Sequence, residues 1–320
     1  MLEIGNFVVG IKFEEPASLP EWKGNFIRGV LAKHVRDISC SRKRQDCKLC
    51  RMRSNCVYYA LFEASAPANA RYLSKLEGIP RPIVISETGM DKSAYECGET
   101  ASFGIVLVGS GLKGLPVIVG ALQNLGECGM SIGGHRGKFV LERVQARGLD
   151  ENNLNVFEDG KLNLDFPRLR FEDFLVKVEN YSGKLCLNFL TPTQIKAEGT
   201  VETPPKFRNL LARLAFRVNA LANYYTGKLE IAEGKIKQML RASENVRIGS
   251  TEIKILPEFL RVSHNKVTRH HMFFMGKIWY EGEFSRDVMA LLRFGSLLHV
   301  GKYAGFGCGE YLLEQEPVQL

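Results

Sequence analysis

Residues 287–315 read DVMALLRFGSLLHVGKYAGFGCGEYLLEQ, and this stretch says more about the fold than any other part of the 320-residue chain. Its first half has the apolar spacing of a helix, and a short apolar strand ends it. Between them, residues 301–309 form a basic turn rich in glycine. Glycine relaxes the steric limits of the backbone, so this turn can approach a ligand closely. Exposed amides beside a helix end, with Lys302 among them, predict an affinity for anions.

A similar outline occurs once earlier, at residues 117–144 (VIVGALQNLGECGMSIGGHRGKFVLERV). A predicted helix ends there near Gly126, a basic glycine-rich turn follows, and a strand begins at Phe139. The glycine spacings of the two turns are similar without being identical. Two copies of one helix–turn–strand unit predict a duplicated domain and not one continuous sheet.

The segments before each copy complete the same order of elements. The first half predicts a strand, a helix, two strands, a helix and a strand, at residues 6–15, 25–38, 81–86, 101–109, 115–126 and 138–145. The second half predicts a strand, a helix, two strands around a polar turn, a helix with Ser285 as N-cap, and a strand, at residues 184–192, 205–227, 258–284, 285–301 and 311–315. Twice over, this is the βαββαβ order of ferredoxin-like and RRM-like domains, so the predicted fold class is α+β.

The predicted domains are residues 1–146 and residues 171–320, the second ending in the glycine-rich turn. Residues 147–170 are polar with weak periodicity, which predicts a linker with short strands. A cysteine-rich insertion at residues 39–58 interrupts the first domain.

Charge favours an anionic partner. The net charge is +8, and between Arg28 and Arg53 nine Lys and Arg stand against two acidic residues. A solvated basic surface is the plainer interpretation, but Arg136, Lys138 and Lys302 in the glycine-rich turns favour nucleic acid. No apolar run reaches membrane-spanning length and the first residues lack a signal-peptide pattern, so we expect a cytoplasmic protein that does not bind membranes.

Four of the eight cysteines are clustered as C-x6-C-x2-C-x5-C: Cys40, Cys47, Cys50 and Cys56. In a reducing compartment such clustering favours a metal over disulfides. One C-x2-C knuckle with two flanking cysteines can complete a tetrahedral, structural zinc site. An iron–sulfur cluster is the less favoured alternative, and a set of thiols without metal is another.

Residues 109–114 (GSGLKG) match the dinucleotide-binding fingerprint between an apolar strand and a helix. Two features oppose this interpretation. The following segment predicts no second βα unit of a parallel sheet. Pro116 suits a first helical turn, so a strand, a turn and a helix are expected here whether or not a cofactor binds. A dinucleotide-dependent enzyme is therefore a minor alternative.

The ending GSLLHVGKYAGFGCGEYLL (295–313), together with LNFLTPTQIK (187–196), resembles the RAMP superfamily. More narrowly, it is similar to the CRISPR-associated endoribonucleases that cut precursor CRISPR RNA within its repeats. GNFIRGVLAKHV (24–35), YYALFE (58–63) and RHHMFFMGKIWYEGEF (269–284) agree, so the resemblance covers essentially the whole chain. It implies two tandem ferredoxin-like domains, the arrangement that the repeated order predicts independently.

The resemblance implies an endoribonuclease without a catalytic metal. The 2′-hydroxyl before the scissile bond attacks the phosphate, giving a 2′,3′-cyclic phosphate and a 5′-hydroxyl. The implied partners are CRISPR repeat RNA and other CRISPR effector subunits, with the chain a monomer or a homodimer. The alternative is a non-catalytic RAMP subunit that binds RNA within an effector complex.

Such a reaction needs a base, an acid and cations, and histidine is the natural acid or base near neutral pH. Similar enzymes often place a catalytic histidine in or after the first helix, which makes His34 the first candidate, beside Lys33. His34 also falls on the apolar stripe of its predicted helix, so a structural role is the alternative. His299 is a further catalytic candidate, and capping of the last helix is its alternative role.

The candidate RNA-binding residues are basic side chains and members of the closing turn: Arg28, Arg36, Arg136, Lys138, Arg269, Gly301, Lys302, Tyr303, Gly305 and Gly307. Three further basic residues of the first half, and three histidines around a predicted turn, are expected to add to RNA affinity or to lie on the surface: Arg42, Lys43, Arg44, His264, His270 and His271.

Overall fold

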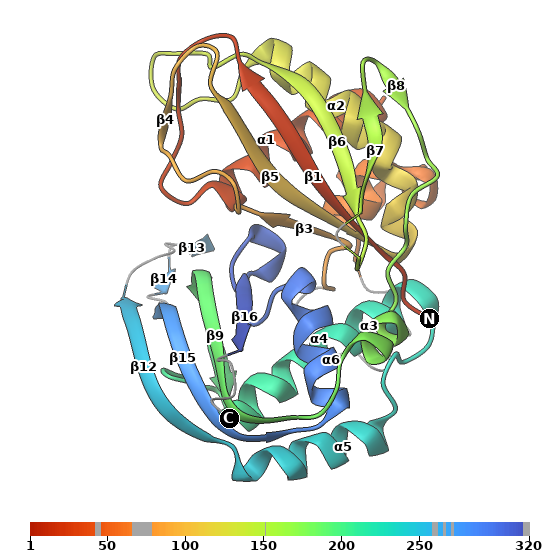
Figure 1. Ribbon diagram of the computed structural model, residues 1–320. Helices are drawn as coiled ribbons and strands as arrows, with labels where there is room; N and C mark the ends of the chain where they lie inside the picture. Colours follow the sequence, from red (N-terminus) through yellow and green to blue (C-terminus); the bar gives the residue numbers. More distant parts are fainter. Residues whose placement is uncertain are drawn as a thin grey trace. The chain divides into compact units, whose positions relative to one another are not determined.

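The computed structural model describes residues 1–41, 46–65, 79–150, 152–257, 262–264, 267–269 and 272–315. It divides into two compact units (Figure 1). The first unit comprises residues 1–170 with two short later segments, 220–228 and 305–307. The second unit comprises the remaining residues from 171 onward. No described helix combines the length and apolar character needed to cross a membrane.

The first unit is built on a sheet of six antiparallel strands in the order β3-β5-β1-β6-β7-β8. Its strands and its two main helices are β1 (Ile4–Phe13), α1 (Lys23–Ser39), β3 (Ile83–Ser86), β5 (Thr100–Val108), α2 (Leu115–Cys128), β6 (Phe139–Arg147), β7 (Asn153–Glu158) and β8 (Lys161–Leu162). β2 (Ala17–Ser18) and β4 (Ala94–Tyr95) form a separate two-stranded sheet, and Tyr95 stacks on Phe13 of β1. In chain order the four core strands stand 2-3-1-4, with a helix after the first and the third, which is the ferredoxin-like arrangement.

The core of the first unit lies between this sheet and the helices α1 and α2, which pack against each other (Figure 1). On α1, Ile27, Leu31 and Val35 recur at helical spacing and are fully buried. Each such side chain contributes roughly 1.5–3 kcal/mol by leaving water. Pro116 stands in the first turn of α2, where its missing N–H costs nothing.

The second unit repeats the plan with four antiparallel strands in the order β12-β15-β9-β16. Its core elements are β9 (Tyr181–Thr193), α4 (Phe207–Thr226, whose last turns belong to the first unit), β12 (Arg247–Leu256), β15 (Phe273–Phe284), α6 (Arg286–Leu298) and β16 (Tyr311–Gln315). The strands again stand 2-3-1-4 in chain order. Shorter elements surround this core: α3 (Phe171–Lys177), α5 (Glu233–Ala242), and the pairs β10 (Ile195–Ala197) with β11 (Thr200–Glu202) and β13 (Val262–His264) with β14 (Val267–Arg269).

The predicted α+β class and the repeated βαββαβ order are confirmed. Ser285 is the N-cap of α6, where its Oγ accepts a hydrogen bond from the Val288 amide at 3.4 Å. Pro192, predicted to end a strand, lies one residue inside β9. Within residues 147–170, β7 pairs with β6 and β8 with β7, so this segment extends the first sheet.

One strand prediction was wrong. The partner of β15 is β12, at residues 247–256, and not a strand within residues 258–272. Most residues of β12 are exposed, including Ile255 with half of its surface in solvent. A strand exposed on both faces does not show the alternation of apolar and polar residues by which strands are recognised.

Candidate functional site

The glycine-rich turn of the second unit is held by its own backbone. The Lys302 amide donates to the Gln194 carbonyl at 3.1 Å, and the Gly309 amide donates to the Pro192 carbonyl at 3.2 Å. The Val300 amide donates to the Gly309 carbonyl at 2.9 Å. These amides close the turn against the end of β9. The amides of Lys302 and Gly309 are therefore not available to an anion, whereas the Lys302 side chain is exposed.

Two positions of this turn require glycine. Gly301 and Gly309 have φ angles of +88° and +75°, which side chains rarely adopt. A Cβ on Gly301 would also overlap the carbonyl oxygen of Gln194, and one on Gly309 the carbonyl oxygen of Val300. The dense glycines thus allow the turn to pack tightly against neighbouring backbone.

His299 lies at the C-cap of α6 with a φ of +61° and is 2% exposed. Its Nδ1 stands 3.2 Å from the Cys308 carbonyl oxygen. This contact ties the helix end to the far side of the glycine-rich turn. Tyr303, also at φ +61°, has its ring 5.4 Å from the Lys302 Nζ.

His34 lies on α1 and is 8% exposed. Burial lowers the pKa of His34 below its usual 6.5, the charge of Lys33 lowers it further, and Asp37 opposes them. The imidazole therefore favours its neutral form near pH 7, the form that a general base needs. Lys33 is exposed beside it.

In the first glycine-rich turn, Arg136 is exposed, whereas Lys138 forms an ion pair with Glu15 at 3.6 Å. The Met130 amide donates to the Gly137 carbonyl at 3.0 Å, and this bond closes the turn. Arg136 is thus the more available cation of the two.

Two candidate arginines of α1 lie against aromatic rings. The Arg28 guanidinium is 5.4 Å from the centre of the Phe62 ring and 4.3 Å from that of Phe306, which belongs to the first unit with Gly305 and Gly307. The Arg36 guanidinium is 5.4 Å from the Tyr58 ring.

Cys40 is the C-cap of α1, Cys47 begins the 3-10 turn Cys47–Leu49, and Cys50 and Cys56 directly follow that turn and the next one, Arg53–Asn55. All four are half-buried free thiols, and the Cys50 amide donates to the Cys47 carbonyl at 3.3 Å. Arg36 forms a side-chain hydrogen bond with Cys40. Burial raises the pKa of the Cys47 thiol, and Arg36 opposes this. Within the described ranges, no three His, Cys, Asp or Glu side chains are arranged to hold a metal, so the zinc site stays a prediction.

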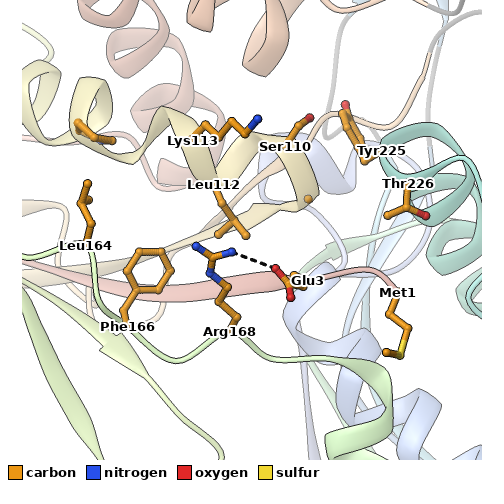
Figure 2. Close-up of a pocket in the computed structure, with 12 residues that line it drawn as sticks. Met1, Glu3, Ser110, Leu112, Lys113, Leu164, Phe166, Arg168, Tyr225 and Thr226 are labelled. Carbon is orange, nitrogen blue, oxygen red and sulfur yellow. Dashed lines mark hydrogen bonds and ion pairs between the residues drawn. The ribbon is translucent and has the colours of Figure 1, made fainter.

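A cavity of about 470 Å³ lies beside the GSGLKG segment (Figure 2). It is lined by apolar side chains including Phe166 and by Lys113 and Arg168, and Arg168 pairs with Glu3 at 3.2 Å. The segment itself is a 3-10 helix between β5 and α2. Because β5 is antiparallel to both of its neighbours, the glycines do not open a parallel βα unit, and the cavity is not a dinucleotide site of that kind.

Several predicted residues have no described side chain. The backbones of Arg269 and His264 are described in β14 and β13. Other predicted residues lie outside the described residues: Arg42, Lys43, Arg44, His270 and His271.

Sequence reasoning missed the surroundings of Arg28. Arg81 lies near enough for its charge to act on Arg28, and Phe62 and Phe306 flank it. The one sequence signal for Phe306 was its position as an aromatic residue between two glycines, Gly305 and Gly307, of a predicted turn. Nothing in the sequence pairs Arg81 with Arg28, because 52 residues separate them.

Comparison with known proteins matches the two halves of the chain to two family models. A family model for an N-terminal domain (AF_1859_N) matches residues 2–168, and the model of the CRISPR-associated endoribonuclease Cas6 matches residues 187–311. An uncharacterized protein of Archaeoglobus fulgidus is 21% identical over 296 residues, which cover 91% of both chains.

Solved structures share the fold. A Thermus thermophilus Cas6 (TTHB231) superposes with a TM-score of 0.55 at 12% identity, covering 98% of this chain and 99% of that one. A product complex of Cas6 (TTHB231) gives a TM-score of 0.56 at 15% identity, covering 97% and 100%. A partial Cas6-RT-Cas1–Cas2 complex gives 0.59 at 12% identity, covering 99% of this chain and 46% of that one. The part of this chain that carries the glycine-rich ending, residues 187–311, therefore matches the CRISPR-associated endoribonuclease Cas6, and the solved Cas6 structures share the fold of the whole chain.

Proposed function

We propose that this endoribonuclease cleaves precursor CRISPR RNA within its repeats by attack of a ribose 2′-hydroxyl on the adjacent phosphate. The products are a 2′,3′-cyclic phosphate and a 5′-hydroxyl, and no metal takes part in catalysis. The match of residues 187–311 to the Cas6 endoribonuclease carries this proposal.

In this proposal His34 accepts the proton of the attacking 2′-hydroxyl. Its lowered pKa supports this role, because a neutral imidazole is ready to act as a base at pH 7. Lys33, exposed on the same helix, supplies positive charge as the phosphate gains negative charge. The backbone-closed turn of the second unit shapes the surface from which Lys302 and Tyr303 reach the RNA. Holding the 2′-hydroxyl in line with the leaving oxygen contributes much of the acceleration.

The test uses two RNAs in EDTA: the repeat RNA and the same RNA with one 2′-deoxy residue at the cut site. We expect cleavage of the first alone, with a 5′-hydroxyl on the downstream product that polynucleotide kinase labels directly. Cleavage of both RNAs, or cleavage that EDTA abolishes, would contradict the mechanism.

The same assay decides the alternative, a non-catalytic RNA-binding subunit. Binding of both RNAs without cleavage of either would favour it. Known assemblies such as the Cas6-RT-Cas1–Cas2 complex support the further proposal that this chain meets other CRISPR proteins.

We also propose that Cys40, Cys47, Cys50 and Cys56 hold a structural zinc ion. Three observations support this: the thiols are free and half-buried, three of them stand at two consecutive short turns, and a positive group, Arg36, lies against the fourth, Cys40. Zinc bound by four thiolates carries a net charge of about −2, which a guanidinium offsets.

A further inference from the structure

Arg28 and Arg81 form a pair of like charges in the first unit. Arg28 projects from α1, and Arg81 stands two residues before β3. Burial first, and then the charge of Arg81, lower the pKa of Arg28 to about 10, so Arg28 stays positive at neutral pH. Arg81 also lies beside Gly305, since a Cβ on that glycine would stand 3.9 Å from the Arg81 Cβ, and the next residue, Phe306, lies against Arg28. Two half-buried cations whose charges act on each other repel unless an anion lies between them.

Neither guanidinium is neutralised by a carboxylate within ion-pair distance in the part of the chain that the structure describes. Glu63 is the acidic group that acts on Arg28 from a distance, and its Oε1 accepts a hydrogen bond from the Tyr58 hydroxyl at 3.2 Å. Arg81 donates through Nη1 to the Ala64 carbonyl, which carries no net charge. The pair therefore keeps an excess of positive charge.

The hydrogen-bonding capacity of Arg28 is also incomplete. Its Nε is fully enclosed and has no hydrogen-bond partner among the described residues. A buried donor without a partner costs stability, and so does a half-buried charge. Both costs are offset when the guanidinium binds an oxyanion, since Arg forms its strongest hydrogen bonds with phosphate and carboxylate oxygens.

Two aromatic rings lie against Arg28, the first member of the pair. The Arg28 guanidinium lies 4.3 Å from the centre of the Phe306 ring and 5.4 Å from that of Phe62. Phe306 is 39% exposed, so part of its ring is open to a second planar group. Exposed aromatic rings beside cations are the usual means of binding single-stranded RNA, where bases stack and phosphates meet the charge.

We propose that Arg28 and Arg81 together bind one phosphate of the RNA, while the base of an adjacent nucleotide stacks on Phe306. This inference rests on the proposed function and adds to it a phosphate-binding residue, Arg81, and a stacking residue, Phe306.

The test maps the phosphate by removing its charge. Repeat RNA with a 2′-deoxy residue at the cut site is prepared with a single methylphosphonate, placed in turn at each position. We expect one position at which the methylphosphonate weakens binding by the wild type about 10- to 100-fold. Arg28→Gln and Arg81→Gln should each bind unmodified RNA more weakly by a similar factor and lose sensitivity at that position. The double variant should then be little weaker than either single one.

Arg147→Gln is the matched control, because Arg147 is an exposed arginine of β6 in the same unit. It should keep the wild-type sensitivity at every position. Phe306→Leu should weaken binding of intact RNA but not of RNA with an abasic residue beside the mapped phosphate.

The melting temperature of each variant shows whether weaker binding reflects a loss of folding. If Arg28→Gln does not fold, Arg81→Gln alone is used to test the shared site. Variants that keep the full sensitivity, or that lose it at two different phosphates, would overturn the shared site. If the shared site is overturned but the wild-type protein still binds and cleaves repeat RNA, the proposed function stands. If the wild-type protein binds no repeat RNA, both the shared site and the proposed function are overturned.

Discussion

His34 shows that the burial expected of a structural residue is compatible with the catalytic role proposed for it. Its place on the apolar stripe of α1 predicted burial, and the side chain is 8% exposed. That burial lowers the pKa of His34 and keeps the imidazole neutral. A buried histidine is therefore no argument against catalysis, provided that one edge of the ring reaches the RNA.

His34→Ala should lower the single-turnover cleavage rate by about 10²- to 10⁴-fold, the usual contribution of a general base. The wild-type rate should rise with pH through a value below 6.5, the usual pKa of histidine, and be level from pH 7 to 8. Rates measured from pH 5 to 8 give this profile. His135→Ala, which changes an exposed histidine of the same unit, is the control and should keep both rate and profile. A wild-type rate in His34→Ala would eliminate His34 as the base.

The pH dependence of stability has the same origin and a defined sign. Because the pKa of His34 is lower in the folded chain than in the unfolded one, the unfolded chain binds the proton more readily. The stability that depends on the neutral ring is therefore complete above pH 6.5, and it is lost as the pH falls from 6.5 through the lower pKa of His34 in the folded chain. His34→Asn should show a smaller fall in melting temperature between pH 7.5 and pH 5.5 than the wild type. An equal fall in both proteins would show that other groups set the acid sensitivity.

Among the elements, the two glycine-rich turns were predictable, because a turn can be recognised from glycines that stand close together in the sequence. The hydrogen bonds that close the second turn onto β9 were not predictable, since their partners, Gln194 and Pro192, lie more than a hundred residues away. The same limit hid the pair of Arg28 and Arg81. The edge strand β12 was missed for a different reason, since its exposure on both faces removes the pattern that marks a strand.

Gly309→Ala should lower the free energy of unfolding by about 2 kcal/mol or more, because strain at positive φ is joined by overlap with the Val300 carbonyl. Gly199→Ala is the matched control, since Gly199 has a φ of +87° but open space around its Cα. It should cost only the strain, about 1–2 kcal/mol. Urea denaturation measures both. Equal losses would show that the close approach of the turn to Val300 contributes nothing.

Metal analysis tests the cysteine turns. Protein purified under reducing conditions should contain one zinc ion per chain by mass spectrometry, and chelation should lower its melting temperature. Cys50→Ser should lose the zinc, whereas Cys97→Ser, at an exposed cysteine outside the cluster, should retain it. A reduced protein without stoichiometric metal would remove the proposal.

At the scale of the whole molecule, duplication is what the sequence revealed best. The two sheets have the same 2-3-1-4 strand order, as the repeated order of helices and strands predicts. That order can be recognised from local sequence patterns alone. The candidate residues are not duplicated in the same way. Positive charge is concentrated on α1 and the cysteine turns of the first unit, whereas the second unit contributes the tighter glycine-rich turn. One fold used twice thus carries two different surfaces.

The net charge of +8 predicts that the affinity for RNA falls as the salt concentration rises. For single-stranded RNA, the logarithm of the binding constant should fall linearly with the logarithm of salt concentration, by about 0.7 for each phosphate contacted. Arg136→Gln should reduce the slope by about 0.7 if the exposed Arg136 meets one phosphate. Lys138→Gln should reduce it less, because the ion pair with Glu15 already offsets part of the Lys138 charge. Titrations of uncleavable repeat RNA between about 50 and 300 mM salt measure the slopes of the wild type and the two variants. Unchanged slopes in both variants would exclude the first glycine-rich turn from the RNA-binding surface and leave α1 and the second turn to supply the charge.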